Sequence, residues 1–118
     1  KAVSKAIMQG AKWILVVANL DPYPLSLQRQ FLSLAQLRSI ETSKNLISVS
    51  NTGPTALIKS NGEIDNLLPP NEEIVELFNL NLNSKTTFYT NFGDLPMSLI
   101  CFITFLCLLY LKIRNGIY

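Results

Sequence analysis

The chain has 118 residues, of which 48% are hydrophobic and 15% are charged, so it is long enough for one modest domain. It contains no histidine, which excludes histidine-based acid–base catalysis and histidine metal sites. Residues 1–94 carry equal numbers of basic and acidic side chains, and a body without net charge argues against a nucleic-acid-binding protein.

The first predicted elements are a helix, a strand and a second, longer helix. Residues 1–10 favour a short helix that ends at Gly10. Residues 13–18 form an apolar run rich in β-branched side chains, which predicts a strand buried on both faces. After a loop with two prolines, residues 25–42 predict a helix. The apolar stripe expected on this helix comprises Leu27, Phe31, Leu34 and Ala35.

Two charged residues fall on that same stripe. Arg38 and Glu41 are three residues apart, so their side chains are able to meet on the helix surface. Two interpretations remain open: this end of the helix emerges into solvent, or the two residues form a buried ion pair that supports a neighbouring site.

The middle of the chain predicts further strands. Residues 46–50 favour a strand and residues 51–54 a turn. Asn61-Gly62 between two apolar runs is a strong hairpin signal, and it predicts strands over 55–59 and 63–68. Residues 73–82 also favour a strand, because their asparagines suit a helix poorly. These elements predict an α/β domain, and an incomplete one, because a single main helix cannot cover both faces of the sheet.

An apolar run near the C-terminus predicts a transmembrane helix. Residues 95–111 are 17 uncharged residues without the polar stripe of a helix packed at a protein surface. Lys112 and Arg114 follow at once and place the tail, residues 112–118, in the cytoplasm, with residues 1–94 on the outer face. Cys101 and Cys107 lie within the run and point to different faces, so we expect small hydrophobic side chains there, neither a disulfide nor a nucleophile.

Several short motifs together resemble a known family. They are Gly10-Ala11-Lys12-Trp13, Asn19, the stretch 36–42, Asn51-Thr52-Gly53 and Asn61-Gly62, and they are similar to a nitrilase-superfamily (carbon–nitrogen hydrolase) domain. The stretch 88–96, which leads directly into the final apolar helix, resembles the apolipoprotein N-acyltransferase family. The resemblance covers essentially the whole chain, and the lysine at its first position, in place of an initiator methionine, is expected of a piece of a longer protein.

The resemblance implies an enzyme of the bacterial inner membrane. Residues 1–94 would be the C-terminal part of a periplasmic nitrilase-like α-β-β-α sandwich, followed by one transmembrane helix. The family transfers an acyl chain from a membrane phospholipid, through a cysteine thioester, to the N-terminal diacylglyceryl-cysteine of an apolipoprotein. The expected partners are therefore phospholipid, apolipoprotein and the lipid bilayer, with no nucleic acid, metal or cofactor.

The catalytic residues of the family do not map onto this chain. Its Glu, Lys and Cys would lie upstream, and Lys12, Lys44, Glu41 and the two cysteines do not occupy those positions. The positions that do match have supporting roles in the family motif. They are Asn19, Arg38, Glu41, Asn51, Thr52 and Gly53. For these residues packing and turn geometry, such as a positive φ at Gly53, is the favoured interpretation over substrate contact.

Two alternatives stay open. A tail-anchored membrane protein would keep residues 1–94 in the cytoplasm as a partner-binding module, so the side of the membrane on which Lys85 lies would distinguish it. A fragment of a nitrilase-type amidase with an apolar end is the other, and it would behave as a soluble protein without detergent.

Overall fold

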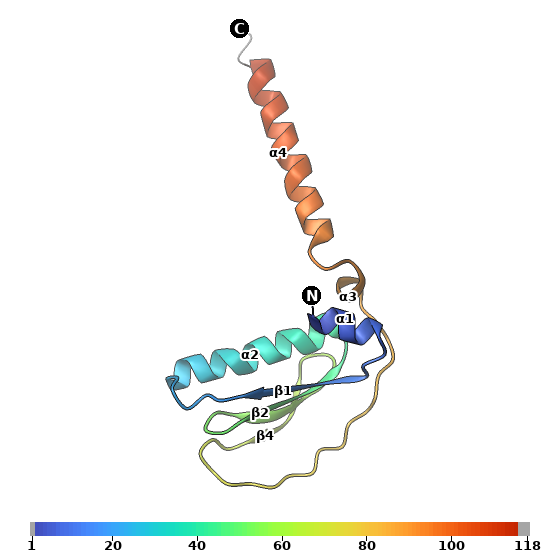
Figure 1. Cartoon of the computed structure of the whole chain (residues 1–118). Coiled ribbons are helices and arrows are strands. Elements are labelled where there is room, and N and C mark those ends of the chain that lie inside the picture. Colours follow the sequence, from blue (N-terminus) through green and yellow to red (C-terminus); the bar gives the residue numbers. More distant parts are fainter. Residues whose placement is uncertain (1, 116–118) are drawn as a thin grey trace.

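A single four-stranded sheet forms the centre of the protein, seen here in a computed structural model that describes residues 2–115. Its strands lie in the order β1 (Trp13–Ala18), β2 (Asn45–Ser50), β3 (Thr55–Ile58) and β4 (Ile64–Leu68). β1 and β2 are parallel and are joined by helix α2 (Leu25–Thr42), which crosses one face of the sheet (Figure 1). The other pairs are antiparallel, so the chain forms a mixed α/β fold, as the sequence predicts.

Helix α1 (Ala2–Met8) and helix α2 match their predicted positions closely. α2 begins after Pro24, whose φ of −65° suits a helix entry. It ends at Ser43, which adopts a left-handed conformation with φ 53° and donates its N–H to the Ile40 carbonyl. Gly10, with φ 105°, follows α1 and turns the chain into β1.

The buried face of α2 differs from the predicted stripe. Of the four stripe residues only Ala35 is buried, while Leu34 is 61% exposed. Polar Gln28 and Ser39 are buried instead, beside a core made of Ala35, Leu46, Ala56 and Ile58. Small side chains let the helix approach the sheet closely, and Ser39 Oγ lies within hydrogen-bond distance of the carbonyl oxygens of Lys44 and Lys59, so its burial is compensated.

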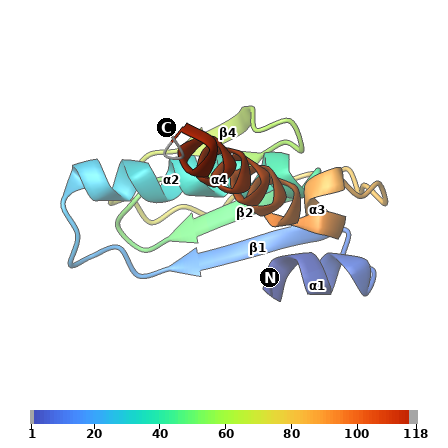
Figure 2. The same cartoon turned by 90° about the horizontal axis from the view of Figure 1, so that it is seen from above.

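The prediction that β1 is buried on both faces is wrong for the described residues. Ile14 and Val16 pack towards α2, whereas Trp13, Leu15 and Val17 are 39%, 53% and 72% exposed on the opposite face. Figure 1 shows α2 on one side of the sheet, Figure 2 shows the same face from above, and in residues 2–115 no second layer of helices or strands covers β1 from the other side. A continuous apolar run therefore indicates that both faces of a strand are apolar, and in β1 helix α2 covers one of them.

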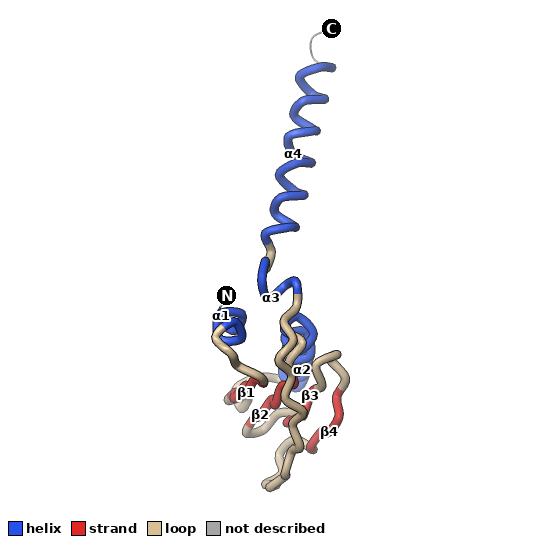
Figure 3. Tube along the Cα trace, turned by 90° about the vertical axis from the view of Figure 1, so that its right-hand side faces the viewer, coloured by secondary structure: helices blue, strands red, loops and turns tan. Residues whose placement is uncertain are grey.

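The strand predicted over residues 73–82 is also wrong. The segment from 72 to 87 is neither helix nor strand and runs past the sheet as an extended connection (Figure 3). Side-chain amides hold it in place of a ladder: Asn45 Nδ2 donates to the Asn81 carbonyl at 2.8 Å, and Asn83 Nδ2 to the Ser43 carbonyl at 2.8 Å. One of these amides belongs to Asn45 of β2 and the other to Asn83 of the segment, so side-chain-to-backbone bonds take the place of strand pairing here.

The extended segment is followed, within residues 2–115, by a short α3 (Phe88–Phe92) and a long α4 (Leu95–Asn115). Within α4, Leu95–Arg114 is long and apolar enough to cross a membrane, with a mean hydropathy of 2.0 and none of that window buried against the protein. α4 projects away from the body in both side views (Figures 1 and 3). Cys101 and Cys107 are free and exposed on it.

We expect Gly62→Ala to destabilise the protein more than Gly10→Ala. Both glycines have positive φ, so each substitution carries a backbone cost of about 1–2 kcal/mol. A Cβ at Gly62 would additionally lie 2.6 Å from Ile40 Cδ1 of α2, whereas one at Gly10 meets nothing within 4 Å. The half-exposed Ile40 side chain must change rotamer to make room, which adds about 0.5–1.5 kcal/mol, and thermal unfolding of the two variants measures the difference. Equal losses would contradict the close packing of the hairpin turn on α2.

Candidate functional site

The carboxyl ends of the parallel strands β1 and β2 bring two of the predicted site residues together. Asn51 Nδ2 donates to Asn19 Oδ1 at 2.8 Å, although the two residues are 32 positions apart. Asn51 Oδ1 in turn accepts the backbone N–H of Leu20 at 2.9 Å. Parallel strands end at the same edge of a sheet, so their following loops are neighbours, and here the asparagine pair joins them.

Gly53 packs tightly against the residues of this cluster. It is buried, and a Cβ built on it would lie 2.6 Å from Leu20 Cδ1 and 3.1 Å from Ser50 Oγ. Its φ is not positive, so the expectation of a left-handed glycine is wrong. Lack of space, which the sequence does not reveal, is what requires glycine at this position.

Gln28 of α2 is a site residue that the sequence analysis missed. Its side chain is 6% exposed, and its Nε2 donates to the carbonyls of Leu20 at 3.2 Å and Tyr23 at 2.9 Å. Gln28 thereby fixes the loop after β1. Its signal in the sequence is a polar residue seven positions before Ala35, on the face that is buried.

Arg38 and Glu41 lie at the opposite end of α2, near the start of β2. Arg38 Nη1 is 2.7 Å from Glu41 Oε2, and their side chains are 40% and 19% exposed. The ion pair that the spacing predicts is therefore formed, half in solvent and half covered. The six predicted site residues fall into two groups at opposite ends of the sheet, with Asn19, Asn51, Thr52 and Gly53 in the first and Arg38 and Glu41 in the second.

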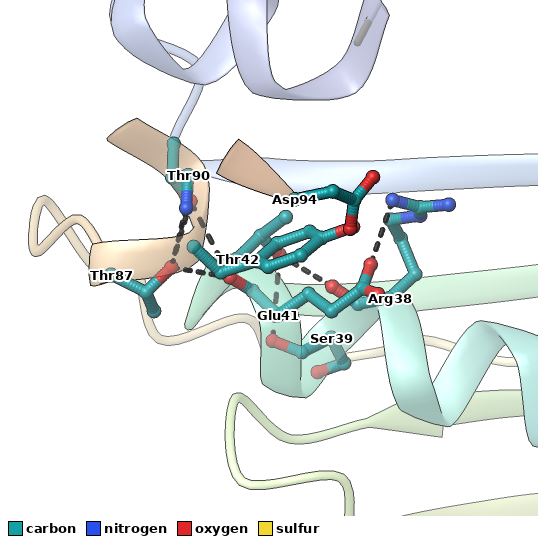
Figure 4. A network of polar contacts seen from close by, with 8 residues as sticks. Arg38, Ser39, Glu41, Thr42, Thr87, Thr90 and Asp94 are labelled. Atoms are coloured by element: carbon teal, nitrogen blue, oxygen red, sulfur yellow. Dashed lines mark hydrogen bonds and ion pairs between the residues drawn. The ribbon is translucent and has the colours of Figure 1, made fainter. Parts of the chain in front are cut away.

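Polar contacts connect the second group to α3 (Figure 4). The hydroxyl of Thr87 donates to the Glu41 carbonyl, and it also accepts the Thr90 N–H at 3.0 Å as the N-cap of α3. Tyr89 donates its hydroxyl proton to Asp94 Oδ1 at 3.1 Å, and this hydrogen bond, with the negative charges of Glu41 and Asp94, raises the pKa of Tyr89. The end of α2 thus holds the segment that leads into α4.

Lys44 adds a further connection between α2 and the extended segment. Its side chain is 1% exposed, and Nζ donates to the carbonyls of Asn83 and Lys85, both at 2.6 Å. Burial lowers the pKa of the Lys44 amine. Because its partners are main-chain carbonyls, this lysine organises backbone and is not paired with a nucleophile.

The side-chain contacts of the described residues stabilise loops and helix ends. Among residues 2–115 no three His, Cys, Asp or Glu side chains are grouped so as to hold a metal ion. Both cysteines are free and exposed on α4, away from the contacts at the two ends of the sheet. The contacts found at the two ends of the sheet position loops.

Comparison with known proteins gives the family. No protein-family model matches the chain. It is 52% identical over 106 residues to an apolipoprotein N-acyltransferase from one strain of Prochlorococcus marinus, covering 86% of the chain and 22% of that protein. It is 46% identical over 114 residues to that of Prochlorococcus marinus subspecies pastoris, covering 96% and 23%. The chain belongs to the apolipoprotein N-acyltransferase family.

More distant family members align as well. The apolipoprotein N-acyltransferase of Thermotoga maritima is 30% identical over 95 residues, which is 78% of this chain and 19% of that protein. The chain thus spans about a fifth of the length of the curated relatives it matches. A match of 114 residues also cannot omit the apolar helix α4, so the likeness extends over body and helix together.

In this family member, Asn51→Ala should loosen the loop after β1. The substitution leaves the buried Leu20 N–H without its acceptor, at a cost of about 1–3 kcal/mol. Asn51→Asp keeps an acceptor oxygen and removes the donor to Asn19, so it should cost less. Chemical denaturation of the two variants compares them, and an equal loss would mean that the Leu20 contact contributes nothing of its own.

We expect a modest coupling between Arg38 and Glu41. Because Arg38 is 40% exposed, the pair should contribute about 0.5–1 kcal/mol, as for ion pairs near a surface. A double-mutant cycle of Arg38→Ala and Glu41→Gln, read by denaturant unfolding, measures that coupling. A value near zero would leave only a solvated helix end, and one above about 3 kcal/mol would indicate a buried pair.

Proposed function

We propose that this chain is part of an enzyme that transfers an acyl chain from a membrane phospholipid to an apolipoprotein. The observation that carries the proposal is the identity of 46–52% to proteins named apolipoprotein N-acyltransferase, over as much as 96% of the chain. The chain would supply the trailing part of the catalytic domain and a membrane helix.

The proposed reaction proceeds through a covalent intermediate on a cysteine outside this chain. The cysteine thiolate attacks the ester carbonyl of the phospholipid, the acyl–oxygen bond breaks, and a protonated lysophospholipid leaves. The neutral α-amino group of the diacylglyceryl-cysteine then attacks the thioester carbonyl, the carbon–sulfur bond breaks, a general base takes the amine proton, and an amide and the cysteine thiolate result. Splitting the transfer into two acyl-transfer steps is the advantage of nucleophilic catalysis, and it requires no metal or cofactor.

The one-sided sheet supports a larger, nitrilase-like sandwich. Trp13, Leu15 and Val17 form an exposed apolar face on β1, and exposing such side chains is unfavourable. In an α-β-β-α sandwich this face packs against a second sheet. We propose that the remainder of the catalytic domain supplies that layer, while α2 remains the outer helix.

In this arrangement the residues at the strand ends act by positioning. Asn19 and Asn51 fix the loop after β1, and Gly53 lets Leu20 pack beneath it. Arg38 and Glu41 stabilise the end of α2, which contacts α3, the helix that precedes the proposed membrane helix α4. None of the six is proposed to take part in a bond-making step.

The proposed location is the bacterial inner membrane, with α4 spanning the bilayer. Lys112 and Arg114 in the last turn of α4 favour the cytoplasmic side for that end. The body, residues 1–94, then lies in the periplasm. A tail-anchored protein would instead keep this body in the cytoplasm.

Expression of the intact protein in bacteria depleted of their own N-acyltransferase tests the function. We expect mass spectrometry to show an N-acylated terminal cysteine on lipoproteins, and we expect Ala in place of the proposed upstream cysteine to abolish it. Asn51→Ala should retain a reduced rate, because its role is positional.

Two outcomes would contradict the proposal. Lipoproteins that stay without the N-acyl chain, while the protein hydrolyses small amides, would indicate an amidase. A cysteine placed at Lys85 should react with a membrane-impermeant maleimide from the periplasmic side, and labelling only after lysis would indicate a cytoplasmic body.

A further inference from the structure

Two exposed aromatic rings lie where the body meets α4. Phe88 and Phe92 of α3 are 65% and 52% exposed, and their ring centroids are 4.5 Å apart. They are four residues apart on a helix, so they occupy one face of it. A close pair of rings left open to water is unfavourable unless another apolar phase covers it.

The opposite face of α3 is bonded to the body. Thr90, two residues from each phenylalanine, is 3% exposed, and its hydroxyl lies 3.4 Å from the Glu41 carbonyl of α2. Two residues correspond to roughly 200° around a helix, so the rings point away from α2. Figure 4 shows Thr87 and Thr90 turned towards the end of α2.

The position of α3 along the chain places those rings near the bilayer. Only Gly93 and Asp94 separate Phe92 from Leu95, where the membrane-competent helix begins. The three Cα steps from Phe92 to Leu95 span at most about 11 Å, only a few Å more than the thickness of one polar layer of a bilayer, which is about 5–7 Å. α3 therefore lies at the surface of any membrane that α4 crosses.

The uncharged stretch of α4 is slightly shorter than the hydrocarbon core of a bilayer, which keeps α3 close to the bilayer surface. From Leu95 to Leu111 the helix rises by roughly 25 Å, a little less than the hydrocarbon thickness of about 30 Å. Lys112 extends to its own interface at the far end, and at the near end the first apolar side chain before Leu95 is Phe92, beyond Gly93 and Asp94. α1 contributes Met8 to a cleft that Phe92 and Leu95 also line.

We propose that Phe88 and Phe92 insert into the boundary between lipid headgroups and acyl chains, so that α3 is a membrane-surface element with lipid as its partner. Its threonine face holds α2 at the same time, and the bilayer thereby sets the height and orientation of the sheet. The inference rests on the proposed membrane-spanning role of α4.

Spin labels at four positions of the intact protein in lipid vesicles test this inference. Single cysteines replace Phe88, Phe92, Phe105 in the middle of α4, and Val75, whose side chain is fully exposed far from α4, with all other cysteines changed to serine. The measured quantity is the ratio of collision rates with oxygen, which concentrates in lipid, to those with a water-soluble nickel chelate. Each label at 88 or 92 is read while the other phenylalanine remains.

We expect the ratio to be highest at 105, lowest at 75, and severalfold above the latter at 88 and 92. A high ratio at 105 with water-like values at 88 and 92 would overturn the inference and leave the membrane helix intact. Low accessibility to both reagents at 88 and 92 would also overturn it, because the rings would then be covered by protein. A water-like ratio at 105 would instead show that α4 does not cross the membrane, which refutes the proposed location first.

Discussion

The last turn of α2 is the point on which most of the structure depends. Buried backbone carbonyls need hydrogen-bond partners, and here one short stretch satisfies groups from three directions. Ser39 reaches the carbonyls of Lys44, before β2, and Lys59, at the hairpin turn, while the Glu41 carbonyl accepts from α3. Lys44 then adds the carbonyls of Asn83 and Lys85. The sheet, the extended segment and α3 thus share one polar junction, and its burial explains why the inner face of α2 is not uniformly apolar.

A second constraint is that the sheet is finished on one side only. α2 covers the face that carries Ile14, Leu46 and Ile58, whereas the opposite face of β1 stays apolar and exposed. The chain spans about a fifth of the length of its relatives, so an unfinished layer agrees with membership of a much larger protein. The polar contacts at the carboxyl edge, around Asn19 and Asn51, are already in place without that second layer.

Local signals in the sequence were sufficient for the elements whose boundaries depend on turns. Pro24, Asn61-Gly62 and the apolar run of β1 place α2, the hairpin and the first strand with little error. Facts of packing were not accessible in the same way. The inner face of α2 was misassigned because Ser39 is buried for its hydrogen bonds, and hydrophobicity does not report them.

The candidate site, too, was predictable only where local spacing in the sequence decides which residues meet. The ion pair of Arg38 and Glu41 follows from spacing on a helix, whereas the contact between Asn19 and Asn51 is apparent only once β1 and β2 are known to be parallel neighbours. Gln28 and the clash-limited Gly53 depend on which atoms lie opposite, which is a property of the assembled fold. The strand expected over 73–82 failed because alternation of side chains does not itself supply a partner strand.

The extended segment between β4 and α3 has a consequence for how such proteins diverge. From 72 to 77 its backbone follows no ladder and its side chains are exposed, whereas Phe78 and Leu80 are half-buried and the hydrogen bonds to the body begin at Asn81. Residues gained or lost before Phe78 therefore disturb neither the strand register nor the junction at α2. The length of the chain is free to vary here, so distant members of the family would keep the sheet and α4 while this stretch differs in length.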